Sequence, residues 1–339
     1  MKSVLHAFDI ITPFHMIRSL SYCLSRASVG DHVILHTIPA MNGSFLLKEE
    51  SFVTRSGVQV DISVQRKYRT FPRFFSFFLA RLFFKNNLKG NGFLYLGHHT
   101  YFKPSVLSFF ENALFGKCVR TFSFEEGIGS YHNLSQEREV ARREGKRFYL
   151  ARFFLKKILS SRWLIDCKWG LLSQRQDEKV RYWHQAAVSE LAFNVYKQSG
   201  ECNDAGDSVL YFTSPLVELG LITARENKEL MIKIKNFFLD RGKILKVKPH
   251  PLDRQPYQEM LDSGCVVVSQ APAEVHLSKF RYAAVAGMNS GALLTASIMF
   301  GCQAVNFQSC LPSDAKSKLV LCEELESLFF KYTVDYEDA

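Results

Sequence analysis

The sequence shows few of the features that mark secreted, membrane-spanning or metal-binding proteins. Its eight cysteines form no CxxC pair and no zinc-type spacing, so neither a disulfide framework nor a zinc cluster is expected, and a reducing compartment is indicated. No stretch approaches the roughly 20 apolar residues that are needed to cross a bilayer. The first residues are too polar for a secretory signal peptide. We therefore expect a globular, cytoplasmic protein.

Acidic residues are also in deficit. Asp and Glu number 33 against 43 Lys and Arg, which gives a formal net charge of +10. This balance favours an anionic partner such as nucleic acid, acidic lipid or a phosphorylated small molecule. The hydrophobic content of 47% supports a sizeable core, and 339 residues are enough for about two domains of about 150 residues each.

Two segments combine dense phenylalanine with basic residues. The segment 66–89 contains seven Lys and Arg residues among its aromatic side chains and no carboxylate, and 142–168 has a similar character. This composition is typical of two kinds of helix. One is a buried core helix with a solvated basic edge, and the other is a surface helix that meets a membrane or a partner. The sequence leaves both interpretations open.

The alternation of elements predicts an α/β protein with doubly wound parallel sheets. A first strand over 4–11 runs into Thr12-Pro13, where proline suits the first turn of a helix. The polar, non-periodic segment 197–207 is the expected linker between a domain over 1–200 and a domain over 208–339. Further strands are expected over 33–35, 58–64, 92–96, 119–124, 208–212, 243–247, 265–269, 282–286 and 304–307, and helices over 104–114, 227–239, 257–261 and 292–300.

Four turns with polar side chains follow predicted strands. Ligands of open α/β sheets bind beyond the carboxyl ends of the strands, so these turns are candidates for a shared site, although each one alone also fits a plain surface turn. They are Glu125-Glu126-Gly127 with Ser130 nearby, Thr213-Ser214, Lys248-Pro249-His250-Pro251 and Gly287-Met288-Asn289-Ser290-Gly291.

The residue types in these turns suit transfer from a phosphate-bearing donor. Ser290 is a good N-cap, and the first amides of helix 292–300 with the dipole behind them can hold a phosphate without a metal. The chain contains no Asp-x-Asp pair, the usual means by which nucleotide-sugar enzymes hold Mg²⁺. His250 can stabilise charge on a leaving phosphate, and Glu125 or Glu126 can take the proton of an attacking hydroxyl.

These short islands resemble the motifs of a known group of enzymes. Glu125-Glu126-Gly127, His250-Pro251 and Ser290 resemble the D/E-D/E-G, HP and S-S/T motifs of bacterial sialyltransferases, in the same order. The third motif departs from the pattern, since Asn289-Ser290-Gly291 carries one hydroxyl where the family has two. The islands at Thr12-Pro13, 124–131, 214–218 and 248–251 are similar to glycosyltransferase family 52, the lipooligosaccharide sialyltransferase group.

The resemblance implies a GT-B architecture, in which two Rossmann-like domains face a central cleft with the acceptor on the first and the nucleotide sugar on the second. It implies an inverting transfer, without metal or other cofactor, of sialic acid from CMP-sialic acid to a terminal sugar hydroxyl. Galactose on lipooligosaccharide or capsule is the favoured acceptor. A lipid-linked acceptor would place this bacterial enzyme at the inner face of the inner membrane, where basic segments suit an anionic surface. A homodimer is compatible with the sequence.

The resemblance also divides the candidate residues by role. Glu125 is favoured over Glu126 as the catalytic base, and His250 acts on the leaving phosphate. The expected donor-binding residues are Thr213, Ser214, Lys248, His250, Pro251, Asn289, Ser290 and Gly291. The expected acceptor-side residues are Thr12, Pro13, Gly127 and Ser130, and no metal ligand is expected.

Three other functions remain in competition with this one. The same fold can use another nucleotide sugar. A non-catalytic basic protein that binds nucleic acid fits the charge, but the aromatic residues lie in apolar clusters and not as spaced stacking platforms. A structural component of an envelope assembly complex is the third alternative.

Overall fold

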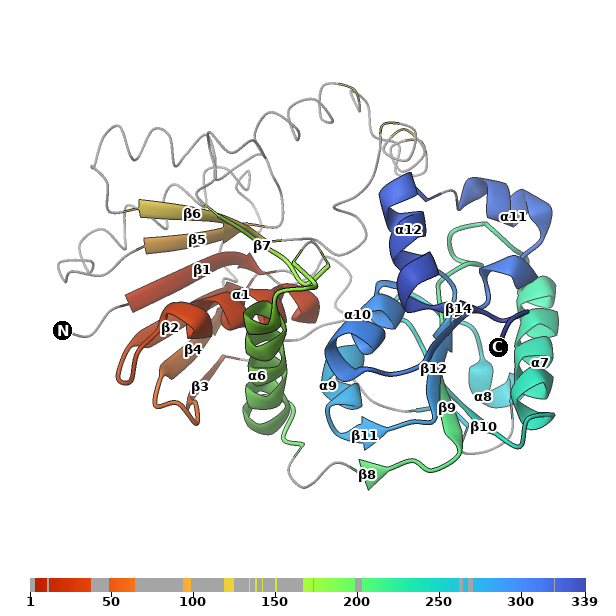
Figure 1. Ribbon diagram of the computed structural model, residues 1–339, viewed down its shortest axis with the longest axis horizontal. Coiled ribbons are helices and arrows are strands. Elements are labelled where there is room, and N and C mark those ends of the chain that lie inside the picture. The colour runs from red at the N-terminus through yellow and green to blue at the C-terminus, as the bar shows by residue number, and fades with distance from the viewer. Residues whose placement is uncertain are drawn as a thin grey trace. The chain divides into compact units, whose positions relative to one another are not determined.

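The structure is a computed structural model. It describes residues 4–10, 12–37, 49–64, 94–98, 119–124, 134, 138, 142, 150, 167–172, 174–198, 203–261, 265–267, 271–319 and 321–339. The chain divides into two compact units, Met1–Glu126 with Glu137–Val195, and Gly127–Gln136 with Tyr196–Ala339 (Figure 1). Within the described ranges, no helix is long and apolar enough to span a membrane.

The first unit is built around its first strand. The strands pair in two sheets, β1-β2-β4-β3 with β3 antiparallel at the edge, and β5-β6-β7. β1 lies beside β5, so the spatial order of the parallel strands is β4-β2-β1-β5-β6-β7 (Figure 1). The strands are β1 (Val4–Ile10), β2 (His32–Thr37), β3 (Glu50–Val53), β4 (Gln59–Val64), β5 (Leu94–His98), β6 (Val119–Phe124) and β7 (Cys167–Trp169).

Two helices of the first unit pack against each other. α1 (Pro13–Arg26) is capped by the hydroxyl of Thr12, which accepts a hydrogen bond from the His15 amide at 3.2 Å, and Pro13 fills the first turn as predicted. α6 (Glu178–Asn194) is capped by Asp177 and was not predicted. Thr12 therefore uses its side chain to begin a helix.

The second unit is built on a five-stranded parallel sheet. Its strands lie in the order β10-β9-β12-β13-β14, and Val266 bridges to Val247 beyond β10. Counted along the chain, this is the 3-2-1-4-5-6 order of a Rossmann-like fold, and the first unit follows the same order from β4 to β7. The strands are β9 (Ser208–Phe212), β10 (Ile244–Lys248), β12 (Ala284–Gly287), β13 (Ala304–Asn306) and β14 (Val334–Asp335).

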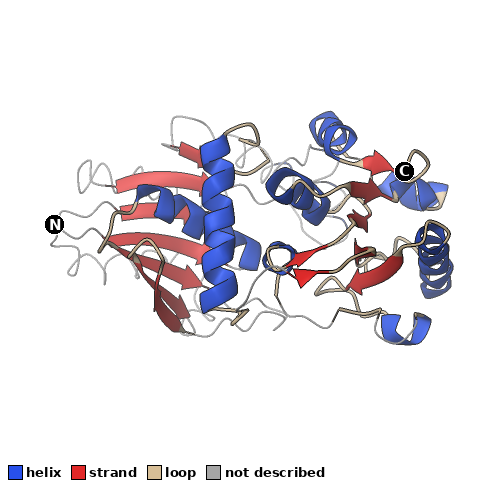
Figure 2. Cartoon of the chain, turned by 60° about the horizontal axis from the view of Figure 1, so that its bottom comes forward, coloured by secondary structure: helices blue, strands red, loops and turns tan. Residues whose placement is uncertain are grey.

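The predicted α/β class, with two Rossmann-like units of the GT-B type, is confirmed. Figure 2 shows the strands of each unit side by side, with helices against them. Inside the predicted linker 197–207, Asn203–Asp204 form β8, which pairs in parallel with β11 (Phe280–Arg281). The facing of two domains across a cleft, and the division of acceptor and donor between them, stay predictions.

Helices flank the sheet of the second unit. α7 begins with a capping box in which Thr223 and Glu226 satisfy each other's backbone amides, so it starts three residues before the predicted 227. The helices are α7 (Ala224–Leu239), α8 (Tyr257–Met260), α9 (Ala273–Leu277), α10 (Gly291–Phe300), α11 (Ser313–Lys318) and α12 (Glu323–Tyr332), with the 3₁₀ turn η3 (Gln308–Cys310).

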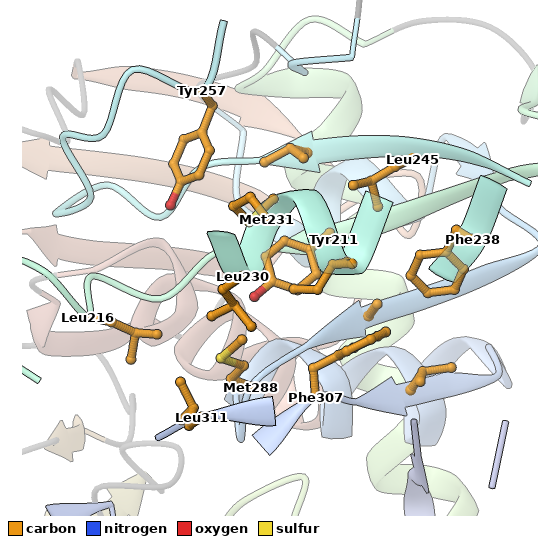
Figure 3. Packing of buried hydrophobic residues seen from close by; sticks show 14 of the residues in the cluster. Tyr211, Leu216, Leu230, Met231, Phe238, Leu245, Tyr257, Met288, Phe307 and Leu311 are labelled. Atoms are coloured by element: carbon orange, nitrogen blue, oxygen red, sulfur yellow. The ribbon is translucent and has the colours of Figure 1, made fainter. Parts of the chain in front are cut away.

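An aromatic cluster fills the core between the sheet and α7. Phe307 has no exposed surface, and its ring lies 5.6 Å from that of Phe238 and 6.5 Å from that of Tyr211 (Figure 3). The ring of Phe237 lies 5.3 Å from it. Edge-to-face pairs of this kind stabilise a core beyond the area that they bury. Phe307 therefore ties the end of β13 to α7.

We expect Phe307→Ala to lower the free energy of unfolding by about 3–5 kcal/mol, because a large cavity would open among packed rings. Urea denaturation of the two proteins measures the difference. Phe330→Ala is the matched control, since that ring is 91% exposed and its loss should change stability by less than about 0.5 kcal/mol. Equal losses for both variants would contradict this account of the core.

Candidate active site

Three of the predicted turns emerge at one edge of the second unit's sheet. Phe212, the last residue of β9, is paired in register with Lys248 at the end of β10 and with Gly287 at the end of β12. The chain order of the strands reverses between β9 and β12, and ligands of doubly wound folds bind in the crevice at such a switch point. The predicted residues after these strands are therefore neighbours.

The loops that follow β9 and β12 touch each other. A Cβ atom on Gly287 would lie 3.1 Å from the carbonyl oxygen of Phe212, so glycine permits the close approach of the two strand ends. Ser214 donates its hydroxyl hydrogen to the Met288 carbonyl at 3.5 Å. This contact fixes the distance between Thr213-Ser214 and the start of α10.

Asn289 holds the loop before α10 in an unusual shape. Its φ of 43° lies in the left-handed region, which asparagine tolerates better than most residues. Its amide donates to Asn306 Oδ1 at 3.2 Å, Asn306 Nδ2 donates to Asn289 Oδ1 at 2.7 Å, and Asn289 Nδ2 donates to Gln308. The Asn289 side chain was expected to bind donor, but it is engaged with β13 and η3, so its role in the site is to shape the loop.

Ser290 caps α10 as predicted. Its Oγ accepts a hydrogen bond from the Ala292 amide at 3.2 Å, so one of the amides that the sequence suggested for phosphate is already used by the cap. The positive end of the ten-residue helix still faces the loop that Asn289 shapes. Gly291 is the first residue of that helix.

His250 is held by its backbone and by its ring. Its amide donates to Thr213 Oγ1 at 2.8 Å, and its Nδ1 accepts from the Leu252 amide at 3.1 Å. Because Nδ1 is an acceptor, the neutral ring carries its hydrogen on Nε2. Loss of water around the ring lowers the pKa of His250 from its usual value, and the charge of Asp253 opposes this, so the neutral donor form prevails at pH 7.

The loop that carries His250 is tied to its surroundings by two carboxylates, Glu218 and Asp253, to which the sequence analysis assigned no role. Glu218 accepts from the Arg254 amide at 3.0 Å and from Gln255 Nε2 at 2.9 Å. Asp253 accepts from the Tyr257 hydroxyl at 2.7 Å and from the Gln255 amide at 3.2 Å. The only sequence signal was their closeness to the Ser214–Glu218 and His250-Pro251 islands.

Lys248 was expected to bind donor, but its side chain is only 8% exposed. It shares a sheet face with Lys246, as the alternation with Val247 predicted. Burial lowers the pKa of Lys248 to about 8, opposed by the charge of Glu274. Burial and the charge of Lys248 lower the pKa of His276 to about 4. Lys248 therefore belongs to a buried charge cluster with Glu274 and His276. Pro251, another expected donor-binding residue, is exposed in the loop after β10.

A cavity of about 390 Å³ lies on this sheet face, lined in part by Lys246, His276, Phe280 and Tyr282. The His276 ring stacks on Phe280 at 4.6 Å, and its Nε2 is hydrogen-bonded to the Tyr282 hydroxyl at 2.7 Å. None of the predicted donor-binding residues lines this cavity, so it is separate from the strand-end site.

The acidic loop of the prediction cannot be placed beside these residues. Glu125, Glu126, Gly127 and Ser130 lie outside the described residues, as do 66–89 and most of 142–168. In the described part of the chain, no group of three or more His, Cys, Asp or Glu could hold a metal ion.

Solved structures resemble the chain only distantly. A Listeria monocytogenes protein crystallised as a candidate UDP-N-acetylglucosamine 2-epimerase is 10% identical with a TM-score of 0.49, over 98% of this chain and 87% of that one. Glycyrrhiza uralensis UGT73P12, complexed with glycyrrhetinic acid 3-O-monoglucuronide, is 12% identical with a TM-score of 0.45, over 99% and 81%. No curated protein sequence matches the chain.

A family match is far more specific. Residues 107–308, more than half of the chain, match the alpha-2,8-polysialyltransferase (POLYST) family. The matched range contains the acidic loop and every predicted donor-binding residue, from Thr213 and Ser214 through His250 to Ser290 and Gly291. The resemblance to glycosyltransferase family 52 in particular is not confirmed, but its coarser content, a sialyltransferase, is. The chain belongs to the alpha-2,8-polysialyltransferase family and is thus a glycosyltransferase that uses a nucleotide-sugar donor and a glycan acceptor.

Proposed function

We propose that the chain transfers sialic acid from CMP-sialic acid to the end of a glycan that already carries sialic acid, with inversion and without a metal. One observation carries the proposal: within the range that matches the family, Thr213, His250 and Ser290 follow three strands whose ends are paired in register. The name of the family supports a sialic-acid hydroxyl as acceptor in place of the galactose suggested by the resemblance to family 52.

In the proposed donor complex, the CMP phosphate lies between the start of α10 and His250. The helix end and the loop shaped by Asn289 offer backbone amides, and His250 offers Nε2–H because its Nδ1 is bonded to the Leu252 amide. As the bond from sialic acid to phosphate breaks, negative charge grows on the phosphate oxygens. Donors that are already oriented stabilise this charge without rearrangement.

The acceptor hydroxyl attacks the opposite face of the sugar, which accounts for inversion. It loses its proton as the new bond forms, so a base must lie within hydrogen-bond reach of it. Glu125 is our first candidate for this base and Glu126 the second, on the strength of the sequence motif. Metal independence is proposed because amides, a helix dipole and an imidazole N–H can together supply the charge stabilisation that Mg²⁺ gives elsewhere.

A donor and acceptor screen tests the proposal directly. We expect the purified chain to release CMP from CMP-sialic acid in the presence of EDTA, with transfer to an α2,8-linked oligosialic acceptor exceeding transfer to a galactose-ended one. Released nucleotide and lengthened acceptor are both measured by chromatography, and UDP-sugars serve as control donors. Release of UDP without CMP would favour the alternative of another nucleotide sugar, and loss of transfer with EDTA would exclude the metal-free mechanism.

Glu125→Gln is expected to lower the transfer rate by about 10²- to 10⁴-fold, because the amide keeps the size of the side chain but cannot accept the proton. Binding of CMP, measured by calorimetry, should stay nearly unchanged, since the base does not touch the nucleotide. Glu126→Gln is the matched control. Wild-type rates in both variants would remove the acidic loop from the mechanism.

His250→Ala is expected to lower the transfer rate by about 10²- to 10⁴-fold and also to weaken CMP binding, since its Nε2–H is lost from the phosphate site. Steady-state kinetics and calorimetry measure the two effects. His32→Ala is the control, because that ring pairs with Asp61 at 2.6 Å in the first unit. A variant that loses rate but binds CMP as tightly as wild type would assign His250 to a step other than phosphate recognition.

A further inference from the structure

The Asp253 carboxyl group lies in an unusual place, where burial raises its pKa above the usual value. It lies three residues after His250 and is half-buried, and in the part of the chain that the structure describes it forms no salt bridge. Its partners are hydrogen-bond donors: the Tyr257 hydroxyl at 2.7 Å and the Gln255 amide at 3.2 Å. Burial of a carboxylate without a paired cation costs desolvation free energy. A neutral polar side chain could hold the loop by hydrogen bonds at a smaller cost.

The backbone of His250 is bonded to two neighbours, Thr213 and Asp253. Thr213 is 3% exposed at the end of β9, and its oxygen accepts from the His250 amide at 2.8 Å. The Asp253 amide in turn donates to the His250 carbonyl at 2.9 Å. The backbone of His250 is thus held at both its amide and its carbonyl.

Asp253 is itself held from the core. Tyr257, 3% exposed in α8, donates to Asp253 Oδ2, and Asn227 in α7 donates to the Tyr257 hydroxyl at 3.5 Å. This chain of hydrogen bonds runs from α7 through α8 to the loop. These bonds anchor the Asp253 carboxylate in the loop that carries His250.

We propose that Asp253 is a positioning residue for His250, which holds the His250 backbone through its own amide and biases the imidazole by its negative charge. The inference rests on the proposed function only in assigning His250 a catalytic task. Other titratable groups on the neighbouring elements are Glu218 in the turn after β9, Lys248 in β10 and Tyr257 in α8. The electrostatic effect on the His250 ring comes from Asp253, whereas Glu218 acts on Asp253 and Lys248 on His276.

The sign of the effect on His250 follows from the charge. A negative group near the ring stabilises the imidazolium, so Asp253 raises the pKa of His250 against the lowering caused by burial. Asp253→Asn keeps the size of the side chain and removes the charge. The pKa of His250 should therefore fall further below its usual value in this variant.

The test uses histidine NMR on the full chain, with the His250 signal assigned by its absence in His250→Ala. In Asp253→Asn we expect a lower pKa for His250 and a loss in kcat of up to about 10²-fold, the size of effect that misplacement of a catalytic group produces. The KM for acceptor should not change. Asp207→Asn is the matched control, because this exposed carboxylate pairs with Lys243 at the opposite end of the sheet and should alter neither quantity.

An unchanged pKa of His250 in Asp253→Asn overturns the inference, and so does a lowered pKa with wild-type kcat. Full activity of His250→Ala would instead overturn the proposed function, while the titration would still report on Asp253. The wild-type chain gives a check that needs no variant. When Asp253 takes up its proton at acid pH, the His250 signal should shift a second time, and a signal without this second step counts against the inference.

Discussion

The in-register pairing of β9 with β10 on one side and β12 on the other is the constraint on which the site depends. Phe212 lies opposite both Lys248 and Gly287, so three loops must leave the sheet at one level. The absence of a side chain at Gly287 lets the ends of β9 and β12 approach closely. A one-residue slip in either pairing would turn every side chain of that strand to the other face and would separate the loops.

Above the strand ends, the loops are shaped mostly by bonds between side chains and backbone. Thr213 binds the His250 amide, Glu218 binds the Arg254 amide, and Asn306 binds the Asn289 amide. Each bond satisfies a backbone group that no strand or helix can reach, which is the requirement that buried turns must meet. The same bonds set the direction of the groups that remain available, above all Nε2 of His250 and the start of α10.

The sequence predicted those parts of this arrangement whose causes are local. Pro13 and Thr12 define the start of α1, Ser290 defines the start of α10, and β6 and β9 have the predicted bounds. α6 escaped prediction because its apolar residues follow helical spacing only weakly, and its place depends on packing against α1. The true partners of Asn289 are Asn306 and Gln308, 17 and 19 residues away, and no local pattern specifies such distant pairs. Asp253 was overlooked because nothing in the sequence distinguishes its contacts with Tyr257 and the His250 backbone from those of an ordinary turn.

The distribution of charge in the second unit fits recognition of a phosphate mainly by neutral donors. Lys248, with a pKa of about 8, is largely charged at pH 7, but it lies beneath the loop and its charge is opposed by Glu274. Asp253 adds a negative charge near His250, and this charge repels a bound anion. Hydrogen-bond donors held at fixed positions are needed to offset the repulsion. The Nε2–H of His250 and the amides at the start of α10 meet that condition, because Leu252 fixes the hydrogen on one ring nitrogen and Asn289 fixes the loop. In the proposed donor complex, the negative charge of Asp253 would favour the imidazolium form of His250 as negative charge develops on the phosphate, while the Asp253 amide holds the backbone of that loop.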